Sequence, residues 1–282
     1  IREARRHKRI AVLLTCFGDE SYTKGRVFAV AAVVGEQEEW DRLEVKWRER
    51  TGGRIFHATD CETDNGDFEG DHQENLKLYA DLTKLVVNSN LMGHAEAVDL
   101  VGFSGAVPEA LPDFPYYRCF LGVVLACGDI GYLSVPQQIV KFTFDQSTSS
   151  RHFNAAELYK YVTEQPVSEL ASSVFLHREL SFGTRELIPI QVADLVAREA
   201  MKYLLNQLSD HKRETRLSMR ALAKLGRFRF SFYTREYFED ARRKLEKASQ
   251  RIMAGYPDWR KRTGRQDNYD SRLRYMTEQD GI

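Results

Sequence analysis

Segments with the pattern of strands and segments with the pattern of helices alternate along most of this chain, and this alternation restricts its fold. Two apolar runs, residues 10–14 and 27–34, flank a polar turn and predict a hairpin. Further strands are predicted over 91–101, 139–145 and 174–180, and helices over 36–50, 73–89, 116–127, 154–163 and 189–207. Because the later strands alternate with helices, the connections must cross over a sheet. We therefore expect an α/β fold in which helices flank a mixed five-stranded sheet.

The chain divides by charge as well as by pattern. Its 282 residues include 41 basic and 41 acidic side chains, so the formal net charge is zero. Residues 201–282 nevertheless hold 20 Lys and Arg against 11 Asp and Glu, which leaves 21 against 30 in residues 1–200. We expect a domain over 1–207, followed by a basic helical extension over 208–282. Such an extension suits a polyanionic ligand, and it is equally explained as a solvated helical surface.

Composition excludes several classes of protein. No apolar stretch reaches the ~18–20 residues that a membrane-spanning helix needs, so no membrane partner is expected. The chain has four cysteines, and they lack the CxxC or Cys/His spacing of a zinc site: Cys16, Cys61, Cys119 and Cys127. These features predict a reduced, cytoplasmic protein without structural zinc.

Three aspartates occupy positions that such a sheet can bring together. Asp19 follows the first apolar run, Asp145 ends the strand over 139–145, and Asp194 lies in the helix over 189–207. If the first and fourth strands are neighbours, Asp19 and Asp145 emerge at one end of the sheet, and a helix packed there brings Asp194 to them. Clustered carboxylates repel unless protons or metal ions intervene, and Mg²⁺ or Mn²⁺ prefers such oxygen ligands. Two such ions can activate water for phosphodiester hydrolysis.

Each site residue also has an ordinary explanation when it is taken alone. Aspartates at strand ends commonly make turns, and Asp194 can pair with Arg198 one helical turn away for ~0.3–0.5 kcal/mol. His57 is equally explained as a proton shuttle near Asp60 and as a hydrogen bond that anchors the following segment. That segment, residues 60–72, is acidic but lacks the spacing of an EF-hand, so we expect a solvated loop.

Four short motifs resemble a known family when they are taken together. "GDES", "FHA", "FDQS" and "IQVADLVA" occur in this order within residues 9–205, and they resemble the bacterial domain-of-unknown-function family 3800. The resemblance implies an RNase H-like fold in which acidic residues hold two divalent metals for nucleic-acid cleavage. By motif position it implies Asp19, Asp145 and Asp194 as metal ligands, Glu20 as an auxiliary ligand and His57 as a site residue. The helix over 116–127 lacks the glutamate that RNase H proteins often supply, so Glu20, Asp60 or Glu199 would have to replace it.

The basic extension adds a second kind of candidate site. Arg242, Arg243, Lys247 and Arg251 lie on a helix predicted over 231–253 and are candidates for binding nucleic-acid phosphates. The same face could bind a partner protein or a second copy of the chain. The leading hypothesis is a nuclease that uses Mg²⁺ or Mn²⁺ to cleave DNA or RNA. The alternatives are a catalytically weak nucleic-acid-binding or adaptor subunit, and a phosphoesterase that acts on small substrates.

Overall fold

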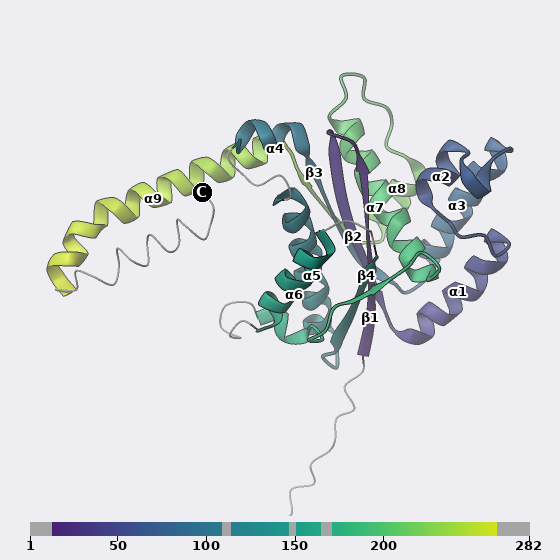
Figure 1. Cartoon of the computed structure of the whole chain (residues 1–282), viewed down its shortest axis with the longest axis horizontal. Helices are drawn as coiled ribbons and strands as arrows, with labels where there is room; N and C mark the ends of the chain where they lie inside the picture. Colours follow the sequence, from purple (N-terminus) through teal and green to yellow (C-terminus); the bar gives the residue numbers. More distant parts are fainter. Residues whose placement is uncertain (1–12, 109–113, 147–150, 165–170, 264–282) are drawn as a thin grey trace, which may run out of the picture.

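The computed structural model describes residues 13–108, 114–146, 151–164 and 171–263. A six-stranded sheet with the order β5-β4-β1-β2-β3-β6 forms its centre (Figure 1). β1 pairs with β2 and β2 with β3 in antiparallel fashion, whereas β4, β5 and β6 each join the sheet in parallel pairings. The strands are β1 (Leu13–Thr23), β2 (Val27–Gly35), β3 (Met92–Asp99), β4 (Ile139–Asp145), β5 (Ser181–Gly183) and β6 (Phe228–Tyr233).

Helices cover both faces of the sheet, which confirms the expected RNase H-like α/β fold class (Figure 1). One face carries α1 (Gln37–Thr51), α2 (Ala58–Thr63), α3 (His72–Asn88), α7 (Ile188–Gln207) and α8 (Leu217–Lys224). The other face carries α5 (Phe114–Leu133) and α6 (Arg151–Glu164), with α4 (Leu100–Ala106) and the start of α9 (Arg235–Thr263) beside them. Two 3₁₀ turns, Gly66–Phe68 and Ala171–Phe175, complete the described elements.

Burial explains why β2 forms the middle of this structure. All nine of its residues are buried, and alternate side chains enter the two apolar clusters on opposite faces. A strand that is covered on both sides reads as a continuous apolar run rather than an alternating one, which is how residues 27–34 appear in the sequence. Val27, Ala29, Ala31 and Val33 therefore define the face of α7, and Phe28, Val30, Ala32 and Val34 define the face of α5.

Three expectations about the sheet were wrong in detail. The sheet has six strands rather than five, because residues 228–233 pair with β3 instead of forming helix. α9 consequently begins at Arg235 rather than at residue 231. The fifth strand lies at 181–183, whereas its predicted range, 174–180, contributes the end of a 3₁₀ turn and one bridge between Leu176 and Val140.

The first strand is also longer than the sequence indicated. It was expected to end at Asp19, but β1 continues to Thr23 because its hairpin partner β2 pairs with it over the whole distance. The pairing with β4 ends earlier, at Gly18 and Phe144, one residue before Asp19 and Asp145. Asp19 therefore marks the end of the parallel pairing rather than the end of the strand.

Outside the body of the sheet, the described chain contains no helix that is both long and apolar enough to cross a membrane. α9 extends away from the layers, and its first turns lie beside α4 (Figure 1).

Candidate active site

The three aspartates expected to form a site all lie on the face of the sheet that α7 covers. Asp19 pairs with Ala31 of β2, whose side chain belongs to the apolar cluster under α7. Asp145 follows Phe144, which enters the opposite cluster, so Asp145 is on the same face as Asp19. Asp19 is fully buried, and Asp145 and Asp194 are only 8% and 1% exposed. The fold thus brings together three carboxylates from β1, β4 and α7.

The same alternation places Glu20 apart from them. Glu20 pairs with Val30, which enters the cluster on the face of α5, so its side chain points to the opposite side of the sheet. The predicted role of Glu20 as an auxiliary ligand beside Asp19 is therefore not supported by its orientation.

Asp19 has an oxygen that the protein leaves without a hydrogen bond. Its Oδ1 accepts a hydrogen bond from the amide of Glu20 at 2.7 Å, but its buried Oδ2 has no such partner. The nearest counter-charge is Arg185, whose Nε lies 3.7 Å from Oδ2 and is itself buried without a hydrogen bond. Burial and the charges of Asp194 and Asp145 raise the pKa of Asp19 well above its usual range, against the opposing effect of Arg185. A buried charged group is normally paired more fully than this.

Arg185 was not anticipated from the sequence. It lies between β5 and α7, and burial alone would lower its pKa, but the charges of Asp19, Asp194 and Asp145 raise it. Gln191 holds this segment in place, because its Nε2 donates to the carbonyl oxygen of Arg185 at 2.7 Å. The other end of Gln191 accepts hydrogen bonds from Trp47 Nε1 at 2.9 Å and from the Phe56 amide at 3.1 Å. One buried amide thus fixes the Arg185 segment relative to α1 and to the approach to His57.

Asp194 is held from α2. Its Oδ2 accepts a hydrogen bond of 2.7 Å from the amide of Ala58, the first residue of that helix. Burial raises the pKa of Asp194, while His57, the Ala58 amide and Arg185 lower it. The predicted ion pair between Asp194 and Arg198 is not formed, because Arg198 instead contacts Glu62 at 2.6 Å.

His57 lies at the edge of this group. Its Nδ1 is 2.8 Å from Asp60 Oδ2, and the side chain is 25% exposed. The contact with Asp60 orients the imidazole and leaves Nε2 as its second functional nitrogen. The structure therefore brings His57 and Asp60 to the cluster, and the acidic segment that follows them forms α2 and a 3₁₀ turn rather than an irregular loop.

As placed, the acids do not form a metal centre. Within the described ranges, no three His, Cys, Asp or Glu side chains stand in an arrangement that could hold a metal ion. The chemistry of the donors nevertheless fits a hard cation, because they are carboxylates and one buried oxygen lacks a hydrogen bond. Arg185 contributes the positive charge that faces these acids.

The basic residues proposed for phosphate binding lie elsewhere, on α9. Arg242 contacts the carbonyl oxygen of Ala106 at 3.1 Å and Glu246 at 3.2 Å, and Arg243 pairs with Asp240 at 3.4 Å. Lys247 is exposed, and the side chain of Arg251 is outside those that the structure describes. Their role in binding nucleic acid stays a prediction.

Comparisons with known proteins add little beyond the outline of the fold. No protein-family model matches the chain, and no curated protein matches it. A chain from the PCNA:RNase HII complex of Archaeoglobus fulgidus is similar at 11% identity and a TM-score of 0.39, over 75% of this chain and 87% of that one. Bst-RNase HIII in complex with Mn²⁺ is similar at 10% identity and a TM-score of 0.38, over 71% of this chain and 56% of that one. A mutant of Bst-RNase HIII gives 9%, 0.36, 76% and 62% for the same quantities. These likenesses are too distant to carry an argument about activity, which must come from the site.

Proposed function

We propose that this chain is a metal-dependent nuclease that hydrolyses phosphodiester bonds of DNA or RNA. The observation that carries the proposal is Asp19, a fully buried carboxylate that shares its face of the sheet with Asp145 and Asp194 and keeps one oxygen without a hydrogen bond. A structural role would be served better by a paired or apolar residue. The motif resemblance to family 3800 points to the same chemistry.

In this proposal Asp19, Asp145 and Asp194 would hold Mg²⁺ or Mn²⁺. When bound, such ions supply charge that lowers the pKa of a coordinated water and stabilises the leaving oxygen. The remaining tasks fall to side chains of this chain. His57, oriented by Asp60, can exchange a proton with solvent or substrate through Nε2. Arg185 is placed to contact a phosphate oxygen once the carboxylates no longer need its charge.

A second function is favoured by Arg185 itself. Because this guanidinium already faces the three aspartates, the site can be balanced without metal, as an adaptor that binds nucleic acid without cutting it would require. The two readings differ in whether metal-dependent cleavage occurs at all.

The deciding experiment is a cleavage assay on end-labelled single- and double-stranded DNA and RNA in Mg²⁺, Mn²⁺ or EDTA. Wild type is compared with Asp145→Asn and with Asp129→Asn, which makes the same chemical change at an exposed position of α5. We expect cleavage that requires metal, falls to the EDTA background in Asp145→Asn and persists in Asp129→Asn. A parallel assay on a small phosphodiester tests the phosphoesterase alternative, which predicts turnover there and none on polymers. Absence of cleavage on every substrate would leave the adaptor function.

A further inference from the structure

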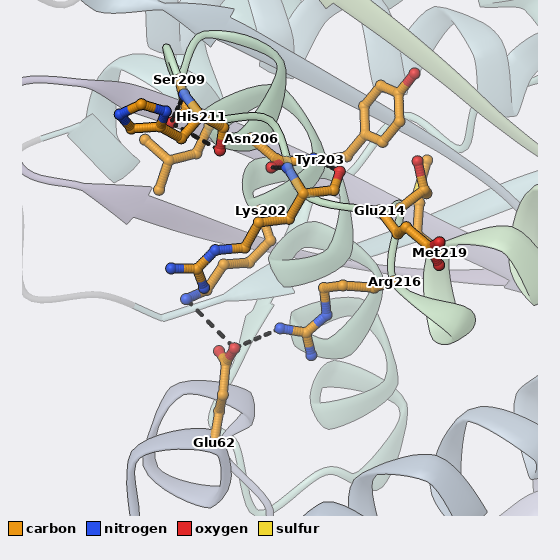
Figure 2. Close-up of a pocket in the computed structure, with 12 residues that line it drawn as sticks. Glu62, Lys202, Tyr203, Asn206, Ser209, His211, Glu214, Arg216 and Met219 are labelled. Carbon is orange, nitrogen blue, oxygen red and sulfur yellow. Dashed lines mark hydrogen bonds and ion pairs between the residues drawn. The ribbon is translucent and has the colours of Figure 1, made fainter.

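A polar pocket of about 500 Å³ lies along α7 from the carboxylate cluster. It is bounded by Glu62 of α2, by the second half of α7 and by the segment that leads to α8 (Figure 2). Lys202 lines it and follows Asp194 by eight residues on α7, a separation of about 12 Å along the helix axis at 1.5 Å per residue. The pocket is therefore close enough to share one extended ligand with the cluster.

Positive charge is concentrated on one wall of this pocket. Glu62 pairs with Lys202 at 3.3 Å, with Arg198 at 2.6 Å and with Arg216 (Figure 2). Arg216 also pairs with the buried Glu199 at 3.1 Å. Three cations thus converge on two carboxylates, which leaves an unbalanced positive charge at the base of the pocket.

Arg213 adds a cation that the protein does not use for its own structure. It lines the pocket, and within the described part of the chain its side chain makes no hydrogen bond or ion pair. Its backbone is nevertheless fixed, since Asn206 accepts a hydrogen bond from the Arg213 amide and donates one to its carbonyl oxygen, both at 2.8 Å. Glu214 also lines the pocket, so the cations there outnumber the acids by one. A free guanidinium on a braced backbone is a typical contact for a phosphate.

We propose that this pocket binds a phosphate group of the nucleic-acid strand whose cleaved bond lies at the aspartates. The proposal rests on the proposed nuclease function for the identity of the strand, but the phosphate site itself does not depend on catalysis. Arg213 and Lys202 would contact the phosphate, and Arg216 would remain paired with Glu62 and Glu199. Binding here would fix the register of the strand two helical turns from the cluster.

The test measures binding in EDTA, where no metal-dependent cleavage occurs. Fluorescein-labelled twelve-nucleotide DNA and RNA strands are titrated with wild type, Arg213→Gln and Lys212→Gln. Lys212 is the adjacent exposed residue of the same segment and does not line the pocket, so the two variants lose equal charge. We expect Arg213→Gln to raise the Kd about tenfold, as loss of one charged hydrogen bond does. The slope of log K against log[salt] should fall by about 0.7 for that variant and little for Lys212→Gln.

Other outcomes separate the sources of the phosphate and the two proposals. If AMP competes at the same site as tightly as the strand does, and in an Arg213-dependent manner, the pocket binds phosphate but serves a free nucleotide. Equal effects of Arg213→Gln and Lys212→Gln, or no binding of strand or AMP by wild type, overturn the pocket. Arg213-dependent binding without cleavage in metal contradicts only the nuclease proposal, and cleavage with unchanged binding in Arg213→Gln contradicts only the pocket.

Discussion

The sheet buries a carboxylate on each of its faces, and the two are treated very differently. Under α5, Glu96 of β3 is 4% exposed and both of its oxygens are hydrogen bonded. Oε1 accepts from Tyr233 at 2.8 Å and Oε2 from Arg118 at 3.1 Å, with His94 3.3 Å from Oε1. Under α7, Asp19 is more deeply buried, yet it has one oxygen without a hydrogen bond.

This difference separates a carboxylate that holds the fold together from one that the fold has to tolerate. Glu96 joins β3, α5 and β6 through side chains whose hydrogen bonds are mutually satisfied, since Arg118 also donates to Tyr233 at 2.8 Å. Asp19 makes no equivalent link and lies close to two further acids. Incomplete satisfaction of a buried charge costs stability, and proteins retain it mainly where a ligand completes the site.

The largest effect should come from breaking the satisfied network. Glu96→Ala leaves the guanidinium of Arg118 and the hydroxyl of Tyr233 without their anion, so we expect a loss of about 3 kcal/mol in the free energy of unfolding. Urea unfolding followed by tryptophan fluorescence measures it. Glu96→Gln, which keeps the shape and one acceptor, should lose clearly less. A loss below about 1 kcal/mol for Glu96→Ala would show that the network contributes little.

A smaller effect should follow from crowding the same carboxylate. A Cβ on Gly122 of α5 would lie within contact-forbidden distance of the Glu96 carboxylate, so Gly122→Ala should cost about 2 kcal/mol through overpacking. The matched change Gly105→Ala meets nothing within 4 Å and should be neutral or slightly stabilising, because alanine favours helix. Both are read from the same urea transitions. Equal stability of the two variants would mean that α5 shifts freely away from β3.

The smallest effect has the opposite sign and concerns Asp19. Asp19→Asn removes a desolvated charge that faces two other acids, so in EDTA we expect a gain of about 1 kcal/mol together with loss of cleavage. Added Mg²⁺ should raise the Tm of wild type, because a ligand that binds only the folded state stabilises it. The variant should lose that response, and Asp129→Asn should keep it. A destabilised Asp19→Asn without metal would place Asp19 with Glu96, as a structural residue.

Much of this architecture was predictable from local patterns. The β2 run and the alternating residues of β4 identified two strands that lie close to their predicted bounds, and the acids that follow β4 and occupy α7 were correctly expected to meet Asp19 on one face. The predicted docking of Phe228 and Phe230 on the core is also confirmed. β6 was missed although a signal was present, because Phe228, Phe230 and Phe232 alternate with polar residues as in a half-buried strand.

The rest depends on contacts that local pattern does not encode. Arg185 reaches Asp19 only because Gln191 fixes the segment between β5 and α7 to α1. Arg198 was expected to pair with Asp194 on its own helix, but α2 supplies Glu62 at a shorter range than the sequence can show. Glu20 follows Asp19 directly, yet the pleat of β1 sends the two side chains to opposite faces.

The parallel pairing of β3 with β6 has a consequence for how the chain is made. β3 is complete at Asp99, but its outer edge receives hydrogen bonds only from residues 228–233. During synthesis, which proceeds at roughly 5–20 residues per second, that edge waits for more than a hundred further residues to leave the ribosome. An uncovered strand edge is a template for pairing with another chain. The nascent protein therefore passes through an interval in which its central sheet is open on one side, and β6 ends that interval.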